Sequence, residues 1–380
     1  MRNASRHILF LATEYDAPGM HPYAINIINS LWQPGDHVMI VTRHGVEAQA
    51  FPEIPADSIT WIDYPAGKVQ RAVFRYFPKR LNQAIDRVLD TCGISLIYSL
   101  TGELVLAPTI HRLQTRVPVL YTVHDAVYHD YKFNSLAEWL KDRMIIAWPQ
   151  QRLFNRTLNK VTNSREQLDY ISRHYPGHQV SYVPFPTLVN DAIAKGGRQV
   201  EELKVVEDGY ILFFGTVQHY KGVHLLGEAY SSHPELQKRA LVIAGKGDLH
   251  LDQSADGLHV IHINRYIDDS ELRDLFTRAG VIVYPYTSAT QSGVTSIAAY
   301  FGRPMVLSDL PFFTQTCSGA AGVEFFPSGD SAALAVAINR AVDSSASTTA
   351  LYDQLYSPEA LRSALSSIIS KVLLSTNSAN

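Results

Sequence analysis

The sequence predicts an α/β protein built from two doubly wound domains. A chain of 380 residues exceeds the size at which a single core stops growing, which favours two domains of roughly 150 to 200 residues. Short apolar runs rich in β-branched residues alternate with helical stretches along the chain. Such continuous runs are typical of parallel strands, because helices cover both faces of a parallel sheet. We therefore expect one parallel sheet in each half.

The first domain is predicted at residues 1–190 and contains seven candidate strands. They span residues 8–13, 37–42, 59–64, 96–99, 119–125, 160–164 and 180–185. The pattern restarts after a polar, glycine-containing segment near residues 190–208. A second domain at 191–356 then has candidate strands at 210–215, 240–245, 260–265, 281–285, 304–309 and 323–327.

The chain ends in a predicted helix and tail at residues 357–380. Ser357 is a favourable N-cap, and Pro358 stands at the first helical position. Leu361, Leu365 and Ile369 fall on one face of this helix, which must pack against another element. We expect it to cross back to the first domain.

Composition narrows the class of function. Apolar residues make up 46% and charged residues 18% of the chain, which is typical of a globular protein. The formal net charge of −3 argues against nucleic acid as the principal partner. Cys92 and Cys317 form no Cys-x-x-Cys pattern, so we expect no zinc site or disulfide framework and a reducing compartment. The expected location is the cytoplasm, where the protein could also attach peripherally to the inner face of the cell membrane.

A loop of small residues at 289–294 points to an anionic ligand. It stands between a predicted strand and a predicted helix, where free backbone N–H groups and the helix dipole favour a phosphate. In open α/β sheets, ligands bind outside the carboxyl ends of the strands. Gly215 and Gly245 end two such strands, and Lys221 precedes a helix nearby in sequence. The alternative for Lys221 is a solvated lysine at a helix start.

Four motifs in the second domain carry a family resemblance. They are ILFFGTVQHYKGVHLL at 211–226, LVIAGKGD at 241–248, IHINRYIDDSEL at 261–272, and the stretch from Tyr284 to Asp309. Their order and spacing resemble the carboxyl-terminal domain of the family 4 retaining glycosyltransferases. These enzymes have the GT-B fold, in which two Rossmann-like domains face a central cleft. Shorter motifs, DAPGMH at 16–21 and TVHD at 122–125, are similar to the family's first domain.

The resemblance implies a site and a reaction. A nucleotide-diphosphate sugar would lie between the domains, with no metal and no cofactor beyond this donor. A hexosyl unit would pass with retention to a saccharide or lipid-linked saccharide acceptor in surface polysaccharide synthesis. The implied catalytic residues are His124 and Gln291. The implied donor-binding residues are Gly19, Gly215, Thr216, Lys221, Gly245, Lys246, Arg265, Tyr266, Thr290, Ser292, Gly293 and Val294.

The sequence departs from the usual family pattern at the charged positions. Thr216 stands where many members carry Arg, and Arg265 is a candidate substitute. The family's two glutamates fall on Ala289 and Ile297, and no Asp or Glu occurs from residue 275 to 308. We interpret the chain as a member of a subset with Ala-Thr-Gln-Ser-Gly-Val in this loop, in which Gln291 replaces a carboxylate. Two alternatives are a catalytically silent nucleotide-sugar-binding protein and a nucleotide-sugar epimerase of the same architecture.

His124 and a basic stretch each have two interpretations. His124 would contact the sugar, or it would be a core-edge histidine tied to a backbone carbonyl. Residues 68–80 mix apolar side chains with cations and contain no acid, which is typical of a segment that lies on an anionic membrane. The alternative is a solvated helix face. The cations are Lys68, Arg71, Arg75, Lys79 and Arg80, and a second candidate surface contains Trp139, Leu140, Arg143 and Trp148.

Overall fold

The structure is a computed structural model of the chain. It describes residues 6–14, 16, 20–43, 48–101, 103–124, 126, 135–136, 139–140, 143–249, 259–288 and 292–377. Contacts divide the chain into two compact units. The first unit consists of Met1–Pro184 and Leu361–Asn380, and the second consists of Phe185–Ala360. The division observed thus falls after Pro184, whereas the sequence analysis set it after residue 190.

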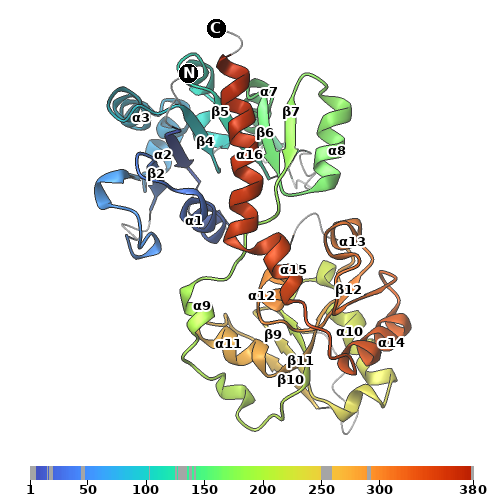
Figure 1. Ribbon diagram of the computed structural model, residues 1–380. Coiled ribbons are helices and arrows are strands. Elements are labelled where there is room, and N and C mark those ends of the chain that lie inside the picture. The colour runs from blue at the N-terminus through green and yellow to red at the C-terminus, as the bar shows by residue number, and fades with distance from the viewer. Residues whose placement is uncertain are drawn as a thin grey trace. The chain divides into compact units, whose positions relative to one another are not determined.

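The first unit is built on a seven-stranded parallel sheet with the order β3-β2-β1-β4-β5-β6-β7 (Figure 1). The strands are β1 (Ile8–Ala12), β2 (His37–Thr42), β3 (Ile59–Asp63), β4 (Leu96–Ser99), β5 (Val119–Val123), β6 (Asn159–Thr162) and β7 (Gln179–Tyr182). All residues of β1, β2, β4 and β5 are buried. This burial on both faces explains why the strands were visible in the sequence as continuous apolar runs.

Helices surround this sheet. They are α1 (Met20–Leu31), α2 (Lys68–Tyr76), α3 (Lys79–Thr91), α4 (Glu103–Leu106), α5 (Ile110–Gln114), α7 (Trp148–Arg156) and α8 (Arg165–His174), with a π-helical turn η3 (Arg143–Ala147) before α7. The start of α8 is fixed by Ser164, whose hydroxyl accepts a hydrogen bond from the Gln167 backbone N–H at 3.3 Å.

The second unit has a six-stranded parallel sheet with the order β10-β9-β8-β11-β12-β13. Its strands are β8 (Tyr210–Phe214), β9 (Leu241–Ala244), β10 (Val260–Ile263), β11 (Ala279–Tyr284), β12 (Met305–Ser308) and β13 (Val323–Phe326). Its helices include α9 (Asp191–Lys195), α10 (Val223–Ser232), α11 (Asp269–Thr277), α12 (Val294–Tyr300), α13 (Pro311–Cys317), α14 (Ser331–Val342) and α15 (Thr349–Leu351). The expectation of two Rossmann-like sheets is confirmed.

The strand order of each sheet contains one switch point. In the first sheet the order reverses between β1 and β4, and in the second between β8 and β11. Loops leaving the carboxyl ends of the two strands at such a point diverge and leave a crevice for ligands. The β8–β11 pair therefore determines where a nucleotide site of the second unit should be sought.

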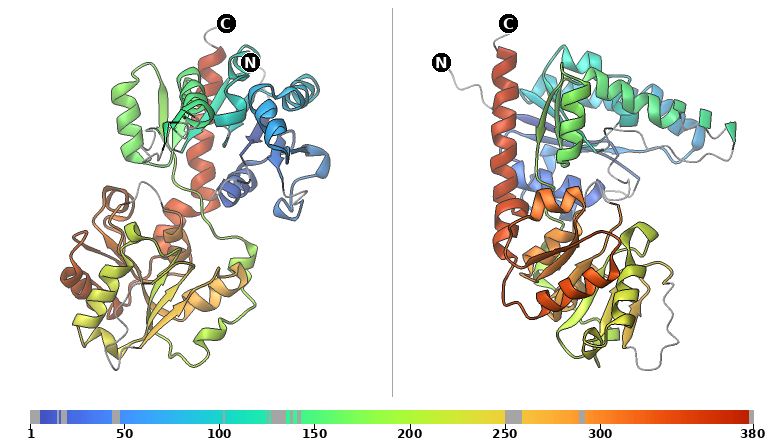
Figure 2. Two further views of the ribbon diagram at one scale, coloured as in Figure 1. Left: turned by 180° about the vertical axis from the view of Figure 1, so that it is seen from behind. Right: turned by 90° about the vertical axis from the view of Figure 1, so that its right-hand side faces the viewer.

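The last helix, α16 (Pro358–Asn377), returns to the first unit as predicted. The Ser357 hydroxyl caps it by accepting a hydrogen bond from the Ala360 N–H at 3.1 Å. Leu365 is fully buried, and the Arg362 Nε donates to the Ser30 carbonyl on α1 at 2.8 Å. Figure 2 shows α16 running along the first unit.

Candidate nucleotide-binding site

Glycines shape the strand ends of the second sheet. Gly215 follows β8 with φ of +133°, and Gly245 follows β9 with φ of +146°. A Cβ on Gly245 would lie 2.1 Å from the Gly215 carbonyl oxygen. Only residues without a side chain allow the two loops to approach this closely. The loops after β8 and β9 therefore pack backbone against backbone at the carboxyl edge of the sheet.

The turn before α10 is locked against the end of β11. Gly222 has φ of +66°, and a Cβ there would meet the Pro285 carbonyl oxygen at 1.8 Å. The Thr287 N–H also donates to the Tyr220 carbonyl at 2.8 Å. These contacts fix the preceding residue, Lys221, at the switch point between β8 and β11.

The Lys221 ammonium is half-buried and has polar neighbours without negative charge. Its Nζ donates to the Thr216 hydroxyl at 3.1 Å and lies 5.7 Å from the centroid of the Tyr286 ring. Burial lowers the pKa of Lys221 below its usual value. Within the described part of the chain, no carboxylate forms an ion pair with it. A desolvated cation without a counter-ion is stabilised by a bound anion.

The amino end of α12 lies in the same unit. No side chain caps this helix, which Gly293 precedes. A Cβ on Gly293 would lie 2.8 Å from both Leu188 and Phe185, so the glycine is required by packing here. Burial raises the pKa of Tyr286, whose ring contacts Lys221, and the neighbouring Ser292 side chain partly opposes this shift. Ser292, Gly293 and Val294 are half-buried.

Three predicted site residues lie outside the described residues. They are Gly19, Thr290 and Gln291. Ala289, the position of the first family glutamate, also lies there. Their roles stay predictions.

Arg265 is held between two carboxylates. Its guanidinium donates to both oxygens of Glu202, at 2.8 and 2.9 Å, and to both oxygens of Glu271, each at 2.8 Å. These hydrogen bonds raise the pKa of Arg265 and lower the pKa of each glutamate. Glu271 is only 3% exposed and belongs to the capping box of α11. Arg265 thus joins the loop after β10 to α11, and its role as a donor-binding residue stays a prediction.

Two further predicted residues lie at the surface. Tyr266 is 77% exposed. Lys246 has an exposed side chain, and its carbonyl accepts a hydrogen bond from the Val217 N–H at 2.9 Å. The loops after β8 and β9 are therefore joined by backbone, while the Lys246 ammonium remains in solvent.

His124 belongs to the first unit, directly after β5. Its Nε2 lies 2.8 Å from the Leu100 carbonyl, and its ring packs edge-on against Tyr23 with centroids 4.9 Å apart. An imidazole nitrogen beside a carbonyl must carry the proton, so Nδ1 is the acceptor of the neutral ring. Nδ1 is buried and has no hydrogen-bond partner among the described residues. The ring bonds a backbone carbonyl, as the core-edge interpretation expects. Its Nδ1 can still accept a hydrogen bond from a ligand hydroxyl.

Sequence reasoning missed two residues that surround Lys221, Gly222 and Tyr286. It also missed Glu202 and Glu271, the two partners of Arg265. The glycine directly after Lys221 was a usable signal, because an αL turn before a helix commonly needs glycine. No local pattern links Glu202 to Arg265, since the two are far apart in sequence.

A separate pocket of about 810 Å³ lies at the opposite end of the second sheet. Its lining includes Gly209, Tyr210, Ala240 and His259, which precede or begin strands. It is therefore distinct from the loops around Lys221.

Fold and strand-end loops together define a two-unit Rossmann-like protein with the GT-B fold. Sucrose-phosphate synthase from Thermosynechococcus elongatus superimposes with a TM-score of 0.60 at 18% identity, over 98% of each chain. Anabaena HepE in complex with UDP and glucose gives 0.64 at 16% identity, over 96% of this chain and 100% of that chain. A UDP-forming trehalose-phosphate synthase from Burkholderia vietnamiensis gives 0.63 at 14% identity, over 97% and 100%. At these identities, the similarity establishes the fold.

The sequence comparison is specific to the second unit. A model of the family described as glycosyl transferases group 1 matches residues 208–344. This segment contains Gly215, Lys221 and α12. A search of the curated proteins found no matching sequence. Among the helices that the structure describes, none is long and apolar enough to cross a bilayer.

Proposed function

We propose that this protein is a glycosyltransferase whose donor is a nucleoside-diphosphate sugar. The observation that carries the proposal is the position of Lys221. This half-buried cation lies at the switch point of the second sheet, within the segment that matches the glycosyl transferases group 1 model. The UDP bound in Anabaena HepE, a protein of the same fold, supports a nucleotide donor.

The residues of the second unit have separate roles in this proposal. Lys221 neutralises the pyrophosphate and stabilises the charge that develops on it as the sugar leaves. The N–H groups of Ser292, Gly293 and Val294 donate to phosphate oxygens. Gly215 and Gly245 admit the donor close to the backbone, next to Thr216. Lys246, Tyr266 and Thr290 also contribute to donor binding.

The finer reaction follows the family 4 resemblance. A hexosyl unit is transferred with retention and without a metal ion, and the departing phosphate oxygen receives the acceptor's proton. His124 and Gln291 bind the sugar, and Gln291 takes the place of a carboxylate. The acceptor is a saccharide or lipid-linked saccharide of surface polysaccharide synthesis. Lys68, Arg71, Arg75, Lys79 and Arg80 attach the protein to an anionic membrane surface.

Titration calorimetry with UDP, GDP, ADP and dTDP, each beside its nucleoside, tests the donor site. Lys221→Ala should weaken diphosphate binding by about 1.5 to 3 kcal/mol and leave the nucleoside unaffected, because only a charge-assisted contact is removed. Lys238→Ala is the matched control, since Lys238 is an exposed lysine of the same unit at the other end of β9. Equal losses for diphosphate and nucleoside would refute the assignment of Lys221.

The silent-protein and epimerase alternatives are separated by one assay. Nucleoside diphosphate release from a panel of nucleotide sugars is measured with and without acceptor. Acceptor-dependent release supports transfer. Binding without release identifies a silent donor-binding protein, and an altered sugar on an intact nucleotide identifies an epimerase.

A further inference from the structure

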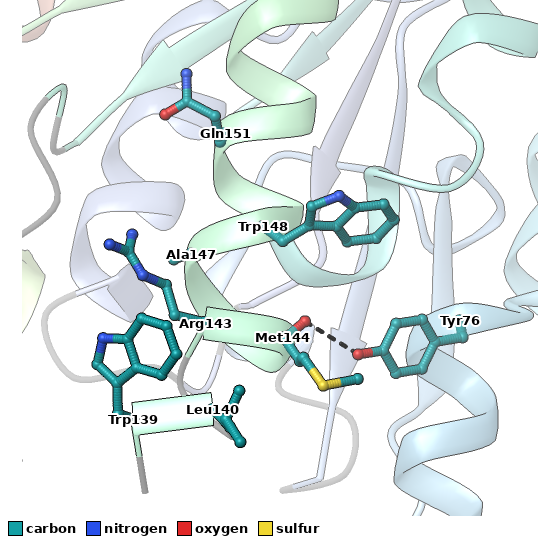
Figure 3. A pocket seen from close by; sticks show the side chains of 8 residues that line it. All are labelled: Tyr76, Trp139, Leu140, Arg143, Met144, Ala147, Trp148 and Gln151. Carbon is teal, nitrogen blue, oxygen red and sulfur yellow. Dashed lines mark hydrogen bonds between the residues drawn. The ribbon is translucent and has the colours of Figure 1, made fainter. Parts of the chain in front are cut away.

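An apolar pocket of about 680 Å³ opens on the first unit (Figure 3). We call it the tryptophan pocket. Its lining comes from α2, from the segment before α7, and from α7 itself. The lining residues are Tyr76, Trp139, Leu140, Arg143, Met144, Ala147, Trp148 and Gln151. This volume is in the range of sites that enclose small organic ligands.

The pocket is joined directly to the basic helix α2. The Tyr76 hydroxyl, at the end of α2, donates to the Met144 carbonyl of η3 at 3.0 Å. Figure 3 shows this bond beside the Trp148 indole, with Met144 between Leu140 and Tyr76. Tyr76 therefore joins the carboxyl end of α2 to the rim of the pocket.

The side chains of the pocket are unusually exposed for their type. Met144 is 62% exposed, Trp148 49%, Leu140 46% and Trp139 39%. Arg143 lies over the Trp139 ring at 5.6 Å, and Arg152 lies over the Trp148 ring at 5.1 Å. Indoles with arginines stacked on them suit a boundary between hydrocarbon and charged headgroups, because each has an apolar body and a polar end.

The α2 side of the surface repeats this combination. Val69 and Phe77 are 77% and 76% exposed. Among the described residues, no ion pair links a carboxylate to any of the five cations on and after α2. An exposed apolar surface interleaved with free positive charge is complementary to an occupant that is anionic outside and hydrocarbon inside. An anionic lipid bilayer has both properties, whereas an acidic protein surface would leave the apolar side chains in water.

We propose that this surface docks on an anionic bilayer and that the tryptophan pocket takes one hydrocarbon chain of a membrane lipid. The proposal rests on the membrane attachment proposed above and adds to it a defined chain-binding site. The cations contact headgroups, while Trp139, Leu140, Met144 and Trp148 enclose the chain. Retention on the membrane then depends on both charge and the pocket.

Flotation of the full chain with phosphatidylglycerol/phosphatidylcholine vesicles tests the proposal. Met144→Asp introduces a charge at the pocket and should lower the partition coefficient by about ten-fold or more, because a carboxylate is costly among hydrocarbon. Val336→Asp is the matched control, since Val336 is 54% exposed on the second unit, and it should partition like the unaltered protein. Equal partition of both variants and the unaltered protein, or no vesicle binding by the unaltered protein, would overturn the proposal.

A second measurement uses the fluorescence of the unaltered protein. Lipids brominated along their chains should quench the tryptophan fluorescence of the unaltered protein, and a soluble quencher should lose access once vesicles are added. Trp148→Phe should lose a large share of this quenching. Equal tryptophan fluorescence with brominated and unbrominated lipids would contradict chain binding. Concentration-dependent self-association through this surface, in place of vesicle binding, would also contradict it.

The two proposals fail in different experiments. UDP binding is measured without vesicles, and neither Met144→Asp nor Val336→Asp should change it. Loss of vesicle binding with intact UDP binding overturns only the lipid site, whereas absence of nucleotide binding overturns the proposed function.

Discussion

Gly222→Ala should be far more disruptive than its size suggests. The new Cβ would lie 1.8 Å from the Pro285 carbonyl oxygen, and the backbone at φ of +66° is left-handed. The left-handed conformation alone costs an alanine about 1 to 2 kcal/mol. Forcing a methyl group into packed backbone adds about 1 to 3 kcal/mol. We therefore expect a total loss of about 2 to 5 kcal/mol in the free energy of unfolding, which lowers the melting temperature by about 4 to 20 °C.

Gly319→Ala separates the two contributions. Gly319 has φ of +76° in the same unit, and a Cβ there meets nothing within 4 Å. This variant should lose only the conformational part, about 2 to 8 °C in melting temperature. Calorimetric scans of both variants measure the difference. In addition, Gly222→Ala should weaken UDP binding, because the displaced turn carries Lys221 away from Tyr286, whereas Gly319→Ala should not. Equal melting temperatures and equal UDP affinities for the two variants would refute the view that this close contact positions Lys221.

Further predictions concern the sugar side, a buried charge and the acid-free loop. His124→Ala should reduce transfer strongly while UDP affinity measured by calorimetry is unchanged; unaltered turnover by a folded variant would reject the role. Burial lowers the pKa of Lys160 to about 7, so the unfolded chain binds more protons between about pH 7 and 10, and stability should rise with pH there by up to about 1.4 kcal/mol per unit. Denaturant titrations at several pH values should show that the free energy of unfolding of Lys160→Met changes less with pH than that of the unaltered protein. The same pH dependence for both would contradict this. Gln291→Ala should lower kcat/KM with little loss of UDP affinity, and a large gain of activity from Ala289→Glu would instead identify a decayed two-glutamate site.

The strands of both sheets could be predicted because buried strands appear in the sequence as continuous apolar runs. Every residue of β1 or of β9 is buried, so the apolar run and the strand coincide. Strand ends were less accurate. The run ending at residue 125 was predicted as strand, but β5 ends at Val123, where its pairing with Thr162 of β6 ends. Local hydrophobicity does not record where hydrogen bonding to the next strand stops.

The candidate site was predictable only in part. Lys221 and Gly215 could be assigned to one edge of the sheet because a parallel sheet sends all its carboxyl ends there. The partners of Arg265 could not be found, since Glu202 reaches it only through tertiary packing. For the same reason, no sequence pattern indicates that Tyr76 and Met144 meet to complete a pocket.

The most direct test of the central claim is acceptor-dependent turnover of a nucleotide sugar. The purified full chain is incubated with each donor and a saccharide acceptor, nucleoside diphosphate release is followed, and the anomeric configuration of the product is read by NMR. We predict release that requires an acceptor, is strongly reduced in Lys221→Ala, persists in Lys238→Ala, and yields a product with the donor's configuration. Diphosphate release by no donor, or release that is independent of Lys221, would contradict the proposed glycosyl transfer at this site.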